Sequence, residues 1–355
     1  MSWQDTGIAE KHVATMLAAT VRVTPGSRKE LPAMLDELAR PIPREVISGP
    51  PFCIIRFVSS ISKGLDAEVG FPVRRALEPE GISTRRFPAL DVLSLVHKGP
   101  LDTLAETYRT LYGAAAKQGL ISDEFAREVY PGWKAGNWDR VEVQFVLHDW
   151  AALFVKSLDD VLGPEARDRL IGEGPAPTVT STLDERFRWV KAMMEQMDGL
   201  ASEEETCDVV SHCAHVFPQE QVDKLRAVYE AAQVKSHDLL DAVDAVLRFM
   251  EEDPGWGSAP SREGRVLYAT KAPRDAEGYA NADTEAERRR AYCFCPIIRN
   301  RLHQGMPPTF CNCGAGWYRQ QWEGAFGMPV RVEIVKSLLR GDDVCQFGIQ
   351  LPRDL

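Results

Sequence analysis

The chain has 355 residues, of which 44% are hydrophobic and 26% charged, a balance typical of folded globular proteins and not of disordered ones. This length favours two domains over one core. The net charge of −10 argues against a surface for nucleic-acid phosphates, so we expect no nucleic-acid partner. No run of about 18 apolar residues predicts a membrane helix. The N-terminus lacks the order of a signal peptide, so we expect a cytoplasmic protein without a membrane partner.

The first 148 residues show one pattern of elements used twice. Helices are expected at residues 25–40, where apolar residues recur at i, i+3, i+4 and i+7, and after Gly99-Pro100. Their order with the strands predicts a duplicated β-α-β-β module over residues 1–150, an antiparallel sheet with helices on one side and a cleft at the internal symmetry axis. The expected strands are 11–23, 52–60, 67–75, 82–97, 124–130 and 140–147.

The second half predicts another α+β domain. Residues 151–172 favour a helix, and the Gly- and Pro-rich segment that follows favours neither helix nor sheet, so we assign 151–181 to a helix and hinge linker. Thr182 and Glu185 have the spacing of a capping box at the start of a helical region that extends to about residue 251. The domain 182–355 is then expected to end in a β-hairpin around Arg340-Gly341-Asp342.

Between residues 10 and 148 the sequence has Pro88-Ala89, then His97, Gly99 and Pro100, then Tyr108 and, in RVEVQFVL, Glu142. The order of these motifs resembles the GyrI-like family, the effector-binding domain of AraC- and MerR-type regulators. Such domains have a Pro-Ala pair between two strands, a His-x-Gly-Pro turn, a tyrosine on the next helix, and an acidic residue in the last strand. The resemblance implies binding of a small organic molecule, hydrophobic or cationic.

The strand RVEVQFVL places Glu142 on one face and Val141, Val143 and Phe145 on the other. A carboxylate in an apolar strand must reach solvent or find a partner. In an aromatic-lined cleft, Glu142 would bind a cationic ligand, and burial would raise its pKa and suit it to general-base work. An exposed Glu142 beside aromatics that only pack is the alternative. The expected ligand-binding residues are Glu142, Tyr108, Tyr112, Trp133 and Trp138.

The same cleft leaves an enzymatic function open. Some relatives of this fold are hydrolases that use a glutamate and a tyrosine to activate water against strained electrophiles. The catalytic residues would then be Glu142 and Tyr108, because neither His97 nor His148 has a nucleophile at a recognisable spacing. We therefore favour a binding and sensing protein, with a hydrolase or detoxifying enzyme as the alternative.

Eight cysteines in a cytoplasmic protein indicate thiols or metal ligands in preference to disulfides. Two Cys-x-Cys pairs would together supply a four-thiolate zinc or iron site. The one-residue spacing, however, places successive side chains on opposite faces of an extended segment, so reduced or redox-active thiols are the alternative. The candidate ligands are Cys293, Cys295, Cys311 and Cys313, with Cys207, Cys213 and His215 as alternatives.

The C-terminal sequence GDDVCQF, at residues 341–347, follows a cysteine-containing turn, a Gly-aromatic helix and a strand. This order resembles the 4-vinyl-reductase family over roughly residues 185–352. The resemblance implies a third function, a sensor that binds a tetrapyrrole or a metal through this domain. The sequence leaves open whether the chain forms a homodimer.

Overall fold

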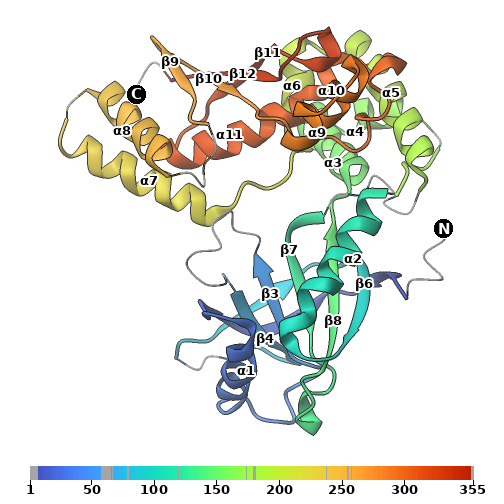
Figure 1. Ribbon diagram of the computed structural model, residues 1–355, viewed down its shortest axis with the longest axis vertical. Helices are drawn as coiled ribbons and strands as arrows, with labels where there is room; N and C mark the ends of the chain where they lie inside the picture. The colour runs from blue at the N-terminus through green and yellow to red at the C-terminus, as the bar shows by residue number, and fades with distance from the viewer. Residues whose placement is uncertain are drawn as a thin grey trace. The chain divides into compact units, whose positions relative to one another are not determined.

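The computed structural model describes residues 7–56, 65, 67–77, 80–117, 120, 122–172, 174–178, 181–236, 238–253, 256 and 258–352. Its contacts divide the chain into two compact units, Met1–His148 and Asp149–Leu355. Within the described residues the first unit contains an eight-stranded sheet and the second a four-stranded sheet, each with helices (Figure 1). The predicted α+β class is confirmed.

All strand pairs in the first sheet are antiparallel, and their order shows the internal repeat. The trio β6-β8-β7 on one half mirrors β2-β4-β3 on the other, and the halves meet where β7 pairs with β3. The predicted duplication is therefore present in the sheet itself. In sheet order the strands are β1 (Ala9–Val13), β6 (Leu90–Lys98), β8 (Arg140–Leu147), β7 (Ser122–Val129), β3 (Phe52–Arg56), β4 (Ala67–Pro72), β2 (Met16–Val23) and β5 (Ser83–Phe87).

Two segments that were predicted as single strands are split. Residues 82–97 form β5 and β6, which are separated at Pro88-Ala89 and lie in opposite halves of the sheet. Proline cannot donate a ladder hydrogen bond, which explains this break. Residues 11–23 form β1 and β2, and no glycine or proline marks the break at residues 14–15. Beyond Arg56, the predicted strand 52–60 lies outside the described residues.

Both helices of the first unit cover the same face of the sheet. Helix α1 (Leu31–Ala39) packs on β4, and α2 (Leu104–Lys117) packs on β6 and β8, as Figure 1 shows. Each helix carries a stripe of fully buried leucines, and burial of one such side chain stabilises a fold by about 1.5–3 kcal/mol. The stripes are Leu31 and Leu35 on α1 and Leu104 and Leu111 on α2.

The second unit begins with helices and ends with a small antiparallel sheet of order β11-β12-β10-β9. The capping box at Thr182 is confirmed, because Thr182 Oγ1 accepts from Glu185 N at 3.2 Å and Glu185 Oε2 accepts from Thr182 N at 2.8 Å. The elements are α3 (Trp150–Leu162), α4 (Pro164–Ile171), α5 (Leu183–Leu200), α6 (Glu203–Ser211), α7 (Gln219–Gln233), α8 (Leu239–Glu252), β9 (Ser261–Glu263), β10 (Val266–Thr270), α9 (Ala276–Ala280), α10 (Glu285–Tyr292), α11 (Asn312–Phe326), β11 (Arg331–Lys336) and β12 (Gln346–Gln350).

Residues 151–171, the helical part of the predicted helix and hinge linker 151–181, form α3 and α4 and belong to the core of the second unit. Trp150, Phe154 and Leu158 from α3 pack with Leu170 from α4 in a cluster that also includes α5 and α6. Helix α3 ends at Gly163, whose φ of +84° suits glycine, and Pro164 begins α4. The apolar faces of both helices therefore have a structural role that a linker would not require.

Two glycines inside helices are expected to respond oppositely to alanine. A Cβ at Gly316 on α11 would lie 2.0 Å from the backbone oxygen of Ser211, whereas a Cβ at Gly113 on α2 would meet nothing within 4 Å. Gly316→Ala should therefore lower the free energy of unfolding by about 1–3 kcal/mol or more, and Gly113→Ala should raise it by about 0.5–1 kcal/mol. Calorimetric unfolding of the full chain measures both. Wild-type stability in Gly316→Ala would contradict the close approach of α6 and α11.

Candidate functional site

Glu128 on β7 is fully buried, at 0% exposure, and a buried carboxylate requires partners. Three donors reach it: Tyr108 Oη at 2.6 Å, Tyr130 Oη at 2.7 Å and Arg28 Nε at 2.7 Å. Tyr108 comes from α2, Tyr130 follows β7, and Arg28 begins the 3₁₀ turn η2 (Arg28–Glu30) that precedes α1. We call these four residues the Glu128 cluster.

The charges within the Glu128 cluster are set by burial and by the carboxylate. Burial first, and then the negative charge of Glu128, raise the pKa of Tyr108 and Tyr130 well above the usual value, so both remain neutral phenols that donate. Burial opposes the charge on Arg28, but the attraction of Glu128 outweighs it and raises the pKa of Arg28. The guanidinium also lies over the Tyr108 ring, 5.0 Å from its centroid.

The four predicted aromatics lie on the same face of the sheet as the Glu128 cluster. Tyr108 and Tyr112 pack against Phe145 with ring centroids 5.5 and 4.9 Å apart, and Tyr112 remains 47% exposed. Trp138 packs against the Tyr130 ring. Trp133 packs edge-on against Phe71 of β4, and its Nε1 donates to Asp36 of α1 at 3.0 Å. This helix-covered face is therefore both aromatic and acidic.

Glu142 lies on the opposite face from Glu128. In the β7–β8 register, Glu128 is paired with Val143 and Val129 with Glu142, so the two carboxylates point to different sides. The structure thus brings the predicted aromatics together with Glu128 and not with Glu142. The catalytic pair Glu142 and Tyr108 that a hydrolase would require is separated by the sheet.

A chain of polar contacts surrounds Glu142. Its Oε1 accepts from Lys11 Nζ at 2.8 Å and from Gln144 Nε2 at 2.9 Å, and the side chain is 19% exposed. Gln144 in turn accepts from the buried Arg127 at 2.7 Å. Burial opposes ionisation of Glu142, but the hydrogen bonds from Lys11 and Gln144 outweigh it and lower the pKa, so the expected rise is wrong. A ligand-binding role for Glu142 stays a prediction.

His97 from the family pattern has a structural position. Its Nδ1 lies 2.9 Å from Thr107 Oγ1 and its Nε2 lies 3.1 Å from the Gly99 carbonyl oxygen. The ring is buried and joins the end of β6 to α2. These contacts account for the His-x-Gly-Pro turn without a catalytic role.

The candidate cysteine ligands lie in the second unit as free thiols. Burial raises the pKa of Cys293, Cys295 and Cys311 to about 12, and that of Cys313 to about 11. Ser337 Oγ donates to Cys311 Sγ at 3.2 Å, and Cys313 Sγ donates to the Cys213 carbonyl at 3.4 Å.

The cysteines do not form a ready metal site in this structure. Among the described residues, no group of three or more His, Cys, Asp or Glu side chains is arranged to hold a metal ion. Of the alternative ligands, Cys207 Sγ donates to the Val332 carbonyl at 3.7 Å, and the His215 carbonyl accepts from Gln320. Zinc or iron binding by these residues stays a prediction.

One family model matches most of the first unit. Residues 24–137 match the family model described as the GyrI-like small molecule binding domain. This match covers 114 of the 355 residues, and we call the matched segment the GyrI-like domain. The description of the matched family supports small-molecule binding by this part of the chain. The Glu128 cluster and its aromatics lie within the matched segment or directly beside it.

Solved structures show weaker likenesses. An EcmrR–DNA complex is 21% identical, covers 39% of this chain and has a TM-score of 0.34, and this chain spans only 56% of that one. The isolated EcmrR C-terminal domain is also 21% identical, with 39% and 96% of the two chains covered and a TM-score of 0.34. SAV2435 bound to tetraphenylphosphonium is 5% identical, with 39% and 93% covered and a TM-score of 0.31. Because these TM-scores are low, the expected function of residues 24–137 rests on the family model alone. No curated protein matches the chain.

The second unit matches a different family from the one its sequence resembles. Residues 266–354 match DUF6144, a family of unknown function, and no comparison supports the 4-vinyl-reductase resemblance. No helix in the described parts of either unit is long and apolar enough to cross a membrane.

Proposed function

We propose that the GyrI-like domain captures a bulky organic cation on the helix-covered face of its sheet, with Glu128 as the anionic anchor. The observation that carries this proposal is the position of Arg28. Its guanidinium, an organic cation supplied by the chain itself, contacts the Glu128 carboxylate and the face of Tyr108. A ligand cation that displaced it would find the same carboxylate and the same aromatic face.

The surroundings of Arg28 are suited to such an exchange. Its side chain is 24% exposed, so the guanidinium has a route to water, whereas Glu128 is completely buried. An aromatic face contributes about 0.5–2 kcal/mol to binding of a cation, and more when water is excluded. The half-exposed Tyr112 ring, which rests on Phe145, offers an apolar contact at the edge of the same face.

The matched pair Glu128→Gln and Glu142→Gln tests which carboxylate binds the cation. The probe is tetraphenylphosphonium, an aromatic monocation, titrated calorimetrically into the full chain. Loss of a charged partner costs about 1.5–3 kcal/mol, so we expect at least a tenfold weaker affinity in Glu128→Gln and less than a twofold change in Glu142→Gln. Loss in Glu142→Gln alone would instead establish the site that the strand alternation predicts.

Two further variants keep the test decisive if Glu128→Gln is poorly folded. Tyr112→Ala removes only a half-exposed ring and should weaken binding, by roughly tenfold if the ring is a main contact. Arg28→Met removes the internal competitor and should tighten binding of the cation. Weaker binding in Arg28→Met, or no saturable binding of tetraphenylphosphonium to the wild-type chain, would contradict the proposal.

A further inference from the structure

The face of the first sheet that lies opposite Glu128 carries Arg127, and we call it the Arg127 face. Helices α1 and α2 both lie on the Glu128 face, so no helix in the described part of this unit covers the Arg127 face. Although the whole chain has a net charge of −10, the basic side chains that the described strands place on this face outnumber the acidic ones. The basic residues are Lys11, Arg22, Arg56, Arg85, Lys98, Arg127 and Arg140, and the acidic residues are Glu68 and Glu142.

Side chains from distant strands meet over the centre of the Arg127 face. Strand β5 is separated from β3 by β2 and β4, which on a flat sheet would place the two strands roughly 14 Å apart. The rings of Phe52 on β3 and Phe87 on β5 nevertheless pack edge-on, with centroids 5.6 Å apart. Arg127 Nη1 on β7 lies 3.9 Å from Met16 Sδ on β2, across the same number of strands. These contacts shelter the centre of the face without a helix.

Arg127 lies in this sheltered centre as a cation without a carboxylate partner. The residue is only 4% exposed, and its Nε donates to Gln144 Oε1 at 2.7 Å. Among the described residues, the one acceptor beside its Nη groups is the thioether of Met16, which is a weak acceptor. Burial lowers the pKa of Arg127, and the attraction of Glu142 offsets this only in part. A buried guanidinium with unused donors favours an added acceptor, and an anion would be the strongest one.

The two acids of the Arg127 face are already engaged by other cations. Glu68 accepts from Arg56 Nη2 at 3.0 Å and from Arg85 Nε at 3.1 Å. Glu142 accepts from Lys11 Nζ at 2.8 Å. Both carboxylates are therefore neutralised before the buried guanidinium is considered, and positive charge remains in excess.

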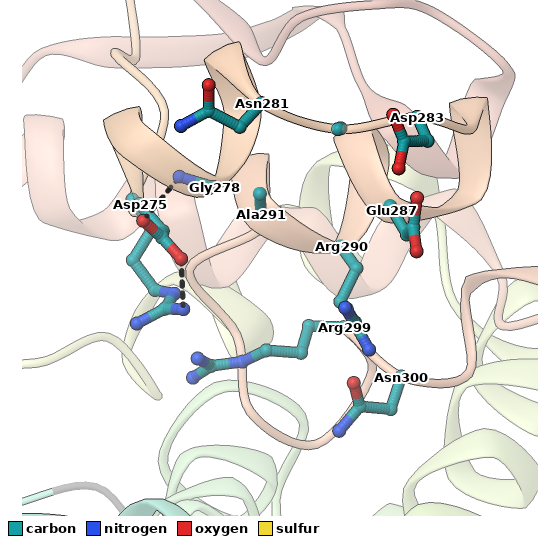
Figure 2. A pocket seen from close by; sticks show the side chains of 11 residues that line it. Asp275, Gly278, Asn281, Asp283, Glu287, Arg290, Ala291, Arg299 and Asn300 are labelled. Atoms are coloured by element: carbon teal, nitrogen blue, oxygen red, sulfur yellow. Dashed lines mark hydrogen bonds and ion pairs between the residues drawn. The ribbon is translucent and has the colours of Figure 1, made fainter.

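The polar cleft beside α9 and α10 in the second unit has no such excess of charge. It has a volume of about 460 Å³, and three arginines and three acids line it (Figure 2). These residues are Arg274, Arg290 and Arg299, and Asp275, Asp283 and Glu287. Because the charges in this cleft balance, the Arg127 face is the better candidate for an anion.

We propose that the Arg127 face binds an aromatic carboxylate, with the carboxylate on the Arg127 Nη groups and the ring on the apolar patch beside them. This patch consists of Met16, Phe87 and Phe125, of which Met16 and Phe125 are half-buried. Methionine is a flexible side chain, so Met16 can yield its weak contact to a stronger acceptor. The guanidinium fork matches the two oxygens of a carboxylate, and such bonds are about twice as strong as neutral ones. The site lies across the sheet from Glu128 and does not depend on the cation site proposed there.

The variants Arg127→Met and Lys98→Gln test the site as a matched pair. Both remove one positive charge from the Arg127 face, but Lys98 is exposed and lies at the end of β6, paired with Arg140. 1-Naphthoate is titrated calorimetrically into the full chain. We expect saturable binding that weakens at least tenfold in Arg127→Met and less than twofold in Lys98→Gln.

Two further measurements keep the test decisive if Arg127→Met is poorly folded. Glu142→Gln removes the negative charge that attracts Arg127 and should tighten binding of 1-naphthoate by about threefold or more. 1-Naphthamide has the same ring without the charge and should bind the wild-type chain at least tenfold more weakly. The proposal is overturned by an absence of saturable 1-naphthoate binding, by equal losses in Arg127→Met and Lys98→Gln, by weaker binding in Glu142→Gln, or by the amide binding as tightly as the carboxylate.

Discussion

Replacing Glu128 with alanine is expected to destabilise the GyrI-like domain by about 3–5 kcal/mol, the usual effect of removing one member of a buried ion pair. The substitution would leave the Arg28 guanidinium without its counter-ion. It would also leave the buried hydroxyl groups of Tyr108 and Tyr130 without an acceptor. Each unsatisfied buried group adds a desolvation penalty.

Glu142→Ala is the matched control, because Glu142 occupies the neighbouring strand on the opposite face. Its partner Lys11 is 43% exposed, and such pairs contribute about 0–1 kcal/mol. Hydrogen exchange of peptides from β7 and β8 in the full chain, followed by mass spectrometry, measures the opening free energy of this region in both variants. Equal effects of the two substitutions would show that the Glu128 cluster is not the buried centre of the domain.

Above about pH 9 the second unit should lose stability steeply, because its thiols ionise more readily when unfolded. An unfolded thiol has a pKa near 8.5, whereas burial raises the pKa of Cys293, Cys295 and Cys311 to about 12. Between these values the unfolded chain has lost protons that the folded chain retains. Each thiol then lowers the free energy of unfolding by about 1.4 kcal/mol per pH unit. Below about pH 8 the folded and the unfolded chain both keep these protons, so the thiols do not lower the free energy of unfolding there.

Urea denaturation between pH 7.5 and 10.5 measures this slope. Cys311→Ser removes one titrating group but keeps an acceptor for Ser337, so it should reduce the slope by about 1.4 kcal/mol per pH unit. Bound zinc or iron would hold the thiols as thiolates and flatten the profile, so the metal content of the same sample should be determined. A flat profile in metal-free protein would contradict the raised pKa of these cysteines in the folded chain.

The fold of the first unit was largely predictable from its sequence, because its elements alternate clearly and repeat. The buried carboxylate at the centre of the candidate site, Glu128, was not predicted from the sequence. Alternation correctly put Val143 and Phe145 on one face and Glu142 on the other, but it does not say which face the helices cover. Glu128 lies in an equally suitable strand, and Tyr130 two residues later points to the same side. The two-residue spacing between Glu128 and Tyr130 was the local sequence pattern that could have indicated this site.

The remaining features depend on contacts between distant residues. Arg28 meets Glu128 across 100 positions, and no local pattern pairs them. The close approach at Gly316 depends on how α11 crosses α6, which hydrophobic periodicity does not specify. In each case the tertiary structure supplies what the sequence pattern leaves open.

A crystal structure of the full chain with tetraphenylphosphonium tests most directly whether Glu128 is the anchor for an organic cation. We expect the cation to lie against the rings of Tyr108 and Tyr112, with the Arg28 guanidinium displaced from Glu128. A cation bound beside Glu142 and Lys11, or in the second unit, with the contact between Arg28 and Glu128 intact, would contradict it.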